Sequence, residues 1–336
     1  MSQPSLVRRL LLPLTPLYHL ALALRELRLG SRLEPIRRLR FPVISIGSLS
    51  AGGSGKTPLT IALAQALTRR GLFVDVLSRG YGRQSRLPFR VDPNGTAEDF
   101  GDEPLLIARQ AGVPVYVARQ RYDAGRMAEP ALPDSKSPVV HLLDDGFQHR
   151  QLHRDTDILL LDSNDCKDHL LPAGNLREPL HAMCRANILA IPAGDPELEA
   201  KLKASGWRGP LWRLHRKMEI PPIDGPVAAF CGIARPNQFF DGLEAAGLHL
   251  VSRIAFPDHH RCTATDLGRI LSAARGAGAA ALLTTEKDRV RLGKLAAAFS
   301  ESPRLETVSL RIEIENESSV IALLAEGFQN QPKPIQ

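Results

Sequence analysis

Residues 44–58 have the sequence ISIGSLSAGGSGKTP, and this stretch decides the fold. The apolar run over 41–46 predicts a buried strand, and residues 60–68 carry apolar side chains at helical spacing. Between them lies a glycine-rich turn that ends in Gly55-Lys56-Thr57. A strand, a glycine turn and a helix in this order form a phosphate cradle, because backbone N–H groups and the helix N-terminus converge on an anion.

The cradle gives each of its residues an expected role. Lys56 would reach the β- and γ-phosphates of a nucleotide, and Thr57 would hold Mg²⁺ through its hydroxyl. The strict pattern has glycine where this chain has Ser50, so a turn with a chance Gly-Lys-Thr is the alternative; the flanking strand and helix favour the nucleotide site. The residues expected to bind ATP are Ser50, Ala51, Gly52, Gly53, Ser54, Gly55, Lys56 and Thr57.

Composition limits the remaining possibilities. The 336 residues, 43% of them hydrophobic, are enough for two compact domains. Four cysteines form no CxxC pair, which fits reduced thiols in a cytosolic compartment and gives no metal signature. Eight arginines and two glutamates in residues 1–40 supply six of the seven net positive charges. The rest of the chain is nearly neutral, so a basic body that binds nucleic acid is not expected.

The N-terminal segment is both apolar and basic. Residues 10–24 are mostly leucine and alanine, interrupted by Pro13 and Pro16, and arginines flank them on both sides, including Arg8, Arg9 and Arg32. The run is shorter than the roughly 20 residues of a membrane-spanning helix. A signal peptide and a core helix are alternatives, but we favour a helix that lies in the interface of an anionic membrane.

Two pairs of adjacent acids are candidates for chemistry. Asp102 and Glu103 precede a helical run, where Asp102 could simply cap the helix, or one acid could bind Mg²⁺ while the other accepts a proton. Asp144 and Asp145 follow the apolar strand 138–143, which is the Walker-B arrangement that helps to hold Mg²⁺. In the functional interpretation both pairs lie near the γ-phosphate; the alternatives are a helix cap for Asp102 and a simple turn for Asp144 and Asp145.

The later part of the chain predicts a second unit. Arg177 lies in a loop rich in proline and could contact phosphate or pair with Glu178. Residues 205–226, with tryptophan and several prolines, are typical of a connector. Beyond it, strands and helices alternate again, and His259 and His260 follow a strand; they could bind metal, or a histidine could tune a carboxylate base.

These patterns together predict an α/β fold. We expect a P-loop NTPase-like, doubly wound parallel sheet, a second, smaller α/β domain and an N-terminal membrane-associated helix. The expected division is a membrane-associated segment over 1–40, a P-loop kinase domain over 41–212 and a smaller C-terminal domain over 213–336.

The motifs, taken in order, resemble the tetraacyldisaccharide 4′-kinase family of bacteria with an outer membrane. The family usually has Asn and Thr where this chain has Ser48 and Ser50, exchanges that leave the loop plausible. The resemblance covers nearly the whole chain through GSLSAGGSGKTP, SRGYGR, GDEP, LLDDGFQHR, LLPAGNLREPL, GIARP, FPDHH and TTEKD. It implies phosphorylation, dependent on ATP and Mg²⁺, of the 4′-hydroxyl of a tetraacylated glucosamine disaccharide 1-phosphate, which gives lipid IVA.

The resemblance also implies roles for individual residues. Asp102 matches the proposed base and His259 the histidine coupled to it. Glu103 and Asp144 belong, with Thr57, to the metal side. The catalytic set implied in this way is Asp102, His259, Asp145, Lys56 and Arg177.

The implied partners are the lipid A precursor and the anionic inner-membrane surface. The protein would lie at the cytoplasmic face as a peripheral or monotopic enzyme, with neither nucleic acid nor an obligate protein partner. A partitioning-type switch ATPase is one rival, but its loop needs a lysine where Ala51 stands. A soluble small-molecule kinase is the other, and membrane binding of the N-terminus distinguishes the two.

Overall fold

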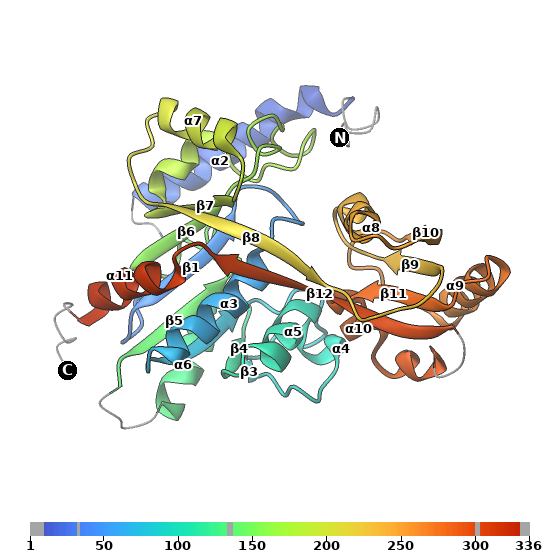
Figure 1. The fold of residues 1–336 in the computed structure, drawn as a ribbon. Coiled ribbons are helices and arrows are strands. Elements are labelled where there is room, and N and C mark those ends of the chain that lie inside the picture. The colour runs from blue at the N-terminus through green and yellow to red at the C-terminus, as the bar shows by residue number, and fades with distance from the viewer. Residues whose placement is uncertain (1–9, 32–33, 133–136, 300–302, 330–336) are drawn as a thin grey trace.

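The computed structural model describes residues 10–31, 34–132, 137–299 and 303–329. Its strands form one sheet in the order β10-β9-β11-β12-β8-β7-β6-β1-β5-β2-β4-β3. Figure 1 shows that this sheet runs through two lobes, each with helices on both of its faces. The predicted α/β architecture with a mainly parallel sheet is confirmed.

The first lobe is centred on the predicted strand, β1 (Val43–Ser48), whose residues are all buried. It pairs in parallel with β5 (Val139–Asp144) and β6 (Thr156–Leu160). The sheet extends through four more strands, of which only the short β3 is antiparallel to its neighbour: β2 (Phe73–Ser78), β4 (Val115–Val117), β3 (Phe89–Arg90) and β7 (Ile188–Pro192).

Helices cover the two faces of this lobe. The helices α3 (Lys56–Arg69) and α5 (Asp102–Gln110) pack on the face formed by Ile44 and Ile46. On the opposite face lie α6 (Arg121–Ala128) and α7 (Pro196–Ala204). Short helical segments complete the lobe: α4 (Ala97–Phe100), η2 (Glu129–Ala131) and η3 (Leu180–Arg185).

The second lobe repeats the arrangement on a smaller scale. Its parallel strands are β9 (Val227–Cys231), β10 (Leu250–Ala255) and β11 (Ala281–Thr285). Apolar clusters lie on both faces of these strands. The helices of the lobe are α8 (Pro236–Ala245), α9 (Ala264–Gly276), α10 (Glu286–Leu292) and η4 (Gly293–Phe299).

A two-stranded antiparallel ribbon joins the lobes. β8 (Leu211–Glu219) pairs with β7 at its start and with β12 (Arg304–Ile314) over the rest of its length, while β12 begins beside β11. The segment predicted as a connector thus does link the lobes, but as a strand and not as a loop. Trp212 and Leu214 alternate with more exposed side chains, a period of two that the nearby prolines obscured.

The last helix, α11 (Glu317–Gln329), returns to the first lobe. Ile321 and Leu324 are buried in the same cluster as the apolar face of α3. Residues near the end of the chain therefore complete the core around the phosphate loop. The predicted boundary after residue 212 falls inside β8, so the division into 41–212 and 213–336 stays a prediction.

The N-terminal segment forms η1 (Leu12–Leu14) and α2 (Thr15–Gly30). Tyr18 and Leu22 pack against the first lobe, whereas many of the other leucines are exposed. Within the described part of the chain, no helix is both long and apolar enough to cross a membrane. Arg8, Arg9 and Arg32 lie outside the described residues.

The contact of α11 with the first lobe is testable with two adjacent leucines. Leu324 is 8% exposed and Leu323 is 70% exposed. We expect Leu324→Ala to lower the free energy of unfolding by about 2–5 kcal/mol, because it leaves a cavity beside α3. Leu323→Ala should change it by less than about 0.5 kcal/mol. Urea unfolding followed by circular dichroism measures both; equal effects would contradict this packing of α11.

Candidate active site

The glycine loop has the backbone that a phosphate cradle requires. Gly52, Gly53 and Gly55 have φ angles of 75°, 67° and 89°, in the left-handed region that glycine populates without strain. Gly55 directly precedes α3, so the loop ends at a helix N-terminus, as the sequence predicts. On its other side, the Ala51 N–H donates to the carbonyl of Asn175 at 2.8 Å.

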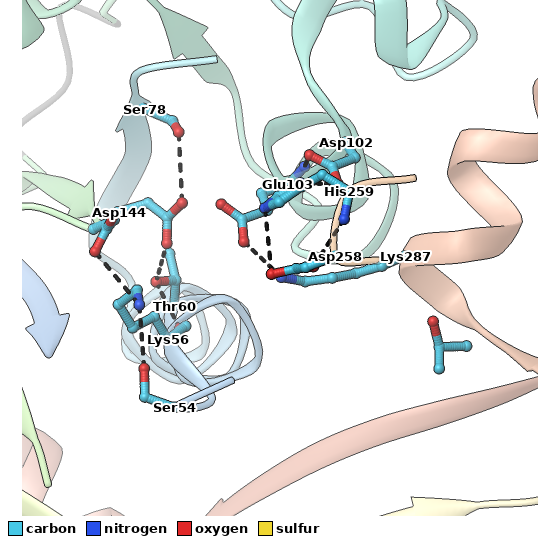
Figure 2. A network of polar contacts seen from close by, with 12 residues as sticks. Ser54, Lys56, Thr60, Ser78, Asp102, Glu103, Asp144, Asp258, His259 and Lys287 are labelled. Atoms are coloured by element: carbon cyan, nitrogen blue, oxygen red, sulfur yellow. Dashed lines mark hydrogen bonds and ion pairs between the residues drawn. The ribbon is translucent and has the colours of Figure 1, made fainter. Parts of the chain in front are cut away.

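Lys56 lies inside this loop. Its Nζ is 3.1 Å from the hydroxyl of Ser54 (Figure 2). The same Nζ is 3.1 Å from the hydroxyl of Ser48 and 3.5 Å from Asp145 Oδ1. Thr57 is buried in the first turn of α3. The ammonium group of Lys56 thus connects the glycine loop with the acids at the end of β5.

Asp144 is a buried carboxylate at the end of β5. It accepts hydrogen bonds from Thr60 Oγ1 at 3.2 Å and from Ser78 Oγ at 3.5 Å (Figure 2). Burial raises its pKa to about 7, and the negative charges of Glu103 and Asp145 act in the same direction. Asp144 therefore lies where negative charge is concentrated, which suits a divalent cation.

Asp145 has a different environment from its neighbour. Its φ angle of 48° turns the chain at the end of β5, and its carboxylate accepts from Arg177 Nη1 at 2.9 Å. Burial alone would raise the pKa of Asp145, but Lys56 and Arg177 outweigh burial and hold it below the usual range. The structure thus brings Arg177 to the phosphate loop through Asp145.

Asp102 and His259 meet across the two lobes. Asp102 Oδ1 accepts the N–H of Glu103 at the start of α5, while Oδ2 lies 3.0 Å from His259 Nδ1 (Figure 2). The helix-start role and the histidine contact therefore use different oxygens of one carboxylate. His260 contacts Asp266 at 3.0 Å and stacks on Phe256.

The pKa values of this pair are shifted in opposite directions. The hydrogen bond to Asp102 raises the pKa of His259 despite partial burial. For Asp102, burial would raise the pKa, but the hydrogen bond to His259 and the charge of Arg291 hold it below the usual range. The histidine is thus the more basic member of the pair.

Two basic residues of α10, which sequence reasoning missed, contact the acids at the start of α5. Arg291 Nε donates to Asp102 Oδ2 at 2.7 Å, and Lys287 Nζ is 2.5 Å from Glu103 Oε1. Their spacing of four residues places both side chains on one face of a helix, which the sequence could have shown. It did not indicate which acids they contact. Arg291 also donates to Asp288 at 2.9 Å and to the carbonyl of Gly232.

The expected metal ligands Thr57, Glu103 and Asp144 stay a prediction. Over the described ranges, no cluster of three or more His, Cys, Asp or Glu side chains is arranged to hold a metal. Mg²⁺ is commonly held by one or two carboxylates together with phosphates of the substrate. Asp144, with Glu103 close enough to affect its pKa, fits that chemistry.

The second lobe also touches the glycine loop. Arg216 Nη2, on β8, donates to the carbonyl of Ser54 at 2.8 Å. Arg235 pairs with Asp162 of the first lobe and covers Gly53, where an added Cβ would lie 2.9 Å from Arg235 Cδ. The phosphate loop is therefore enclosed by residues from both lobes.

Comparison with known proteins agrees with this geometry. The family model described as Tetraacyldisaccharide-1-P 4'-kinase matches residues 7–329. The chain belongs to the tetraacyldisaccharide-1-P 4'-kinase family. A relative from Koribacter versatilis (strain Ellin345), a tetraacyldisaccharide 4'-kinase, is 43% identical over 84% of this chain and 88% of its own. One from Rhodopseudomonas palustris (strain BisB5), with the same name, is 36% identical over 99% and 96%.

A solved member of the tetraacyldisaccharide 4'-kinase family has the same fold. It is the "apo" form LpxK from Aquifex aeolicus in complex with ATP, which is 32% identical and superposes with a TM-score of 0.73. The match covers 96% of this chain and all of the other. The resemblance inferred from the motifs is confirmed.

Proposed function

We propose that this chain transfers the γ-phosphate of ATP to the 4′-hydroxyl of a tetraacylated glucosamine disaccharide 1-phosphate, and so forms lipid IVA. One observation carries the proposal: a phosphate loop with its lysine lies in the first lobe, and an Asp102–His259 pair spans both lobes beside it. A kinase site needs these two halves, one for the nucleotide and one for the hydroxyl that attacks it. The family supplies the identity of the acceptor.

On the nucleotide side, positioning and charge neutralisation do most of the work. Residues 50–57 would bind the phosphates of ATP through backbone N–H groups and the Lys56 ammonium. Thr57, Glu103 and Asp144 would hold Mg²⁺, which when bound neutralises charge on the phosphate oxygens. Arg177 and Lys56 keep Asp145 ionised at the edge of the loop, where it can orient the two cations.

On the acceptor side, we infer that His259 receives the proton from the sugar hydroxyl. Oδ2 of Asp102 is already engaged by His259 and Arg291, and the Asp102 side chain is only 7% exposed. The His259 side chain is 34% exposed and its Nδ1 faces Asp102. Its Nε2, which lies 3.8 Å from Asp258 Oδ2, is the nitrogen that we propose accepts the proton. This division reverses the roles expected from the sequence: Asp102 orients the ring and stabilises the imidazolium that forms.

Activity should depend on the cradle lysine. We expect Lys56→Ala to lower the rate of lipid phosphorylation by about 10²- to 10³-fold or more, because a cation facing the developing charge is lost. Transfer of radiolabel from [γ-³²P]ATP to the disaccharide 1-phosphate in detergent micelles measures it. The exposed Lys294 provides the control, since Lys294→Ala should keep the wild-type rate. A folded Lys56→Ala protein with normal turnover would contradict the assignment of this loop as the ATP site.

The pH dependence of kcat separates the two candidate bases. A base must be deprotonated to act, so kcat should rise with pH through a midpoint above 6.5, the ordinary value for histidine, because Asp102 raises the pKa of His259. His259→Ala should cost about 10²–10⁴-fold in kcat with ATP affinity nearly unchanged.

Asp102→Asn should move this midpoint to lower pH, because the negative charge that favours the imidazolium is gone. Substantial residual activity with a shifted midpoint identifies His259 as the base. Complete loss of activity at every pH, in a folded protein that still binds ATP, would instead assign the proton transfer to Asp102.

We further propose that α2 binds the cytoplasmic face of the bacterial inner membrane, where the lipid acceptor lies. Leu17, Leu20, Leu24 and Leu27 are each at least half exposed and recur at helical spacing. On the side toward the protein, the Tyr18 hydroxyl donates to the carbonyl of Arg177 at 2.9 Å. The exposed leucines can therefore enter an anionic leaflet while α2 stays fixed to a loop of the active site.

The leucine face gives a direct test of membrane binding. Replacing Leu17, Leu20 and Leu24 together by glutamine keeps good helix formers but removes the apolar surface. We expect co-sedimentation with vesicles of phosphatidylethanolamine and phosphatidylglycerol to weaken at least about tenfold, since a buried leucine contributes about 1.5–3 kcal/mol. Leu323→Gln, on α11, is the matched control. Unchanged binding of the triple variant would exclude this face as the principal anchor.

A further inference from the structure

We propose that Lys287 is a positioning residue that serves as an internal counter-cation: its ammonium group occupies the cation position beside Glu103 until a divalent cation takes its place. The proposal rests on the proposed function only in that Glu103 and Asp144 are the carboxylates of the metal side. It adds a residue from the other lobe that competes with the metal.

The contact itself is short and crosses the lobes. Lys287 Nζ lies 2.5 Å from Glu103 Oε1, and Glu103 lies in the first turn of α5 in the first lobe while Lys287 lies in the first turn of α10 in the second. Figure 2 shows the Lys287 side chain extending toward Glu103, with Asp144 and Lys56 on the far side of the site. A positive charge thus stands among the carboxylates where a metal ion would be expected to lie.

The carboxylates need such a charge when no metal is bound. The negative charges of Glu103 and Asp145 both act on Asp144, so three carboxylates share this part of the site. Leaving a partly buried charge without a partner is strongly unfavourable. A lysine ammonium is a compact charge with three donors on a flexible stem, so it can stand in for a small cation and can also leave.

Arg291 shows why Lys287 is the residue that can move. The Arg291 side chain is 4% exposed and contacts Asp102, Asp288 and the carbonyl of Gly232. These contacts hold α10 against α5 without any help from Lys287. The Lys287 side chain is 28% exposed, and the structure gives it one hydrogen-bond partner among the described residues, Glu103. Release of Lys287 would therefore leave the two helices in contact.

Competition for Glu103 has a measurable consequence. A divalent cation that approaches the nucleotide-free protein must displace Lys287 from Glu103. This competition weakens the binding of the cation. Mg²⁺ that arrives with ATP brings phosphate oxygens as additional ligands, so the nucleotide complex can displace Lys287 more readily than the metal alone. Lys287 would thus favour entry of the metal together with ATP.

Mn²⁺ alone serves as the probe, because the EPR signal of free Mn²⁺ reports binding without any catalytic turnover. In nucleotide-free protein we expect Lys287→Met to bind Mn²⁺ at least about tenfold more tightly than the wild type, a difference of 1.4 kcal/mol. Lys287→Arg, which keeps the charge, should bind as weakly as the wild type. Lys294→Met, at an exposed lysine just beyond α10, is the matched control and should change nothing.

A second background shows whether the effect acts through Glu103. In Glu103→Gln protein, adding Lys287→Met should no longer tighten Mn²⁺ binding, because the contested ligand is absent. Melting curves establish that each variant is folded. If Lys287→Met does not fold, Lys287→Gln is used in its place.

Equal Mn²⁺ affinity of the wild type and a folded Lys287→Met protein would overturn the proposal, as would the same tightening in the Glu103→Gln background. Absence of Mn²⁺ binding in every variant would overturn it too, since removal of Lys287 must expose the position. None of these results bears on the kinase assignment, which lipid phosphorylation by the wild-type protein decides separately.

Discussion

Pairing of buried and partly buried carboxylates with cations is the interaction on which this structure depends. Acids at the ends of β5 and at the start of α5 must lie near one phosphate-binding loop, where their charges repel one another. Each is stabilised differently: Asp145 by Arg177 and Lys56, and Glu103 by Lys287. For Asp144, burial and the charges of Glu103 and Asp145 outweigh Lys56 and Lys287 and raise its pKa. Which acid is paired with which cation therefore decides which carboxylates can still bind a metal ion.

The two-lobed sheet makes these pairings possible. The first lobe supplies the glycine loop and the acids, whereas the second supplies α10 and the turn that carries His259. Because β8 and β12 belong to one continuous sheet, they fix how the lobes face each other. The helix α2, which packs on the first lobe beside the Arg177 loop, adds an apolar surface to the same unit. The phosphate loop, the Asp102–His259 pair and this apolar surface thus lie on neighbouring elements.

Sequence patterns did not predict an element with a short alternating pattern, or contacts between residues far apart in the chain. The tryptophan and prolines of residues 205–226 predict only a connector, although Trp212 and Leu214 alternate with polar residues in the part that forms β8. Lys287 belongs to the TTEKD motif and Arg291 lies three residues beyond it, but their partners lie more than 180 residues earlier in the chain. The family resemblance pairs Asp102 with His259, but it does not show that Arg291 also contacts Asp102 and, with the His259 hydrogen bond, lowers the pKa of Asp102.

The sequence by itself determined the phosphate loop and the family. Both depend on local features: the glycines at 52, 53 and 55 adopt left-handed angles that other residues disfavour, and the strand and helix beside them follow from apolar periodicity. Only the tertiary structure decided which cation contacts which acid, and that the contact between Asp102 and His259 lowers the pKa of the first and raises that of the second. The physical reason is that a pKa depends on burial and on the charges within a few ångströms, and here those charges come from the other lobe.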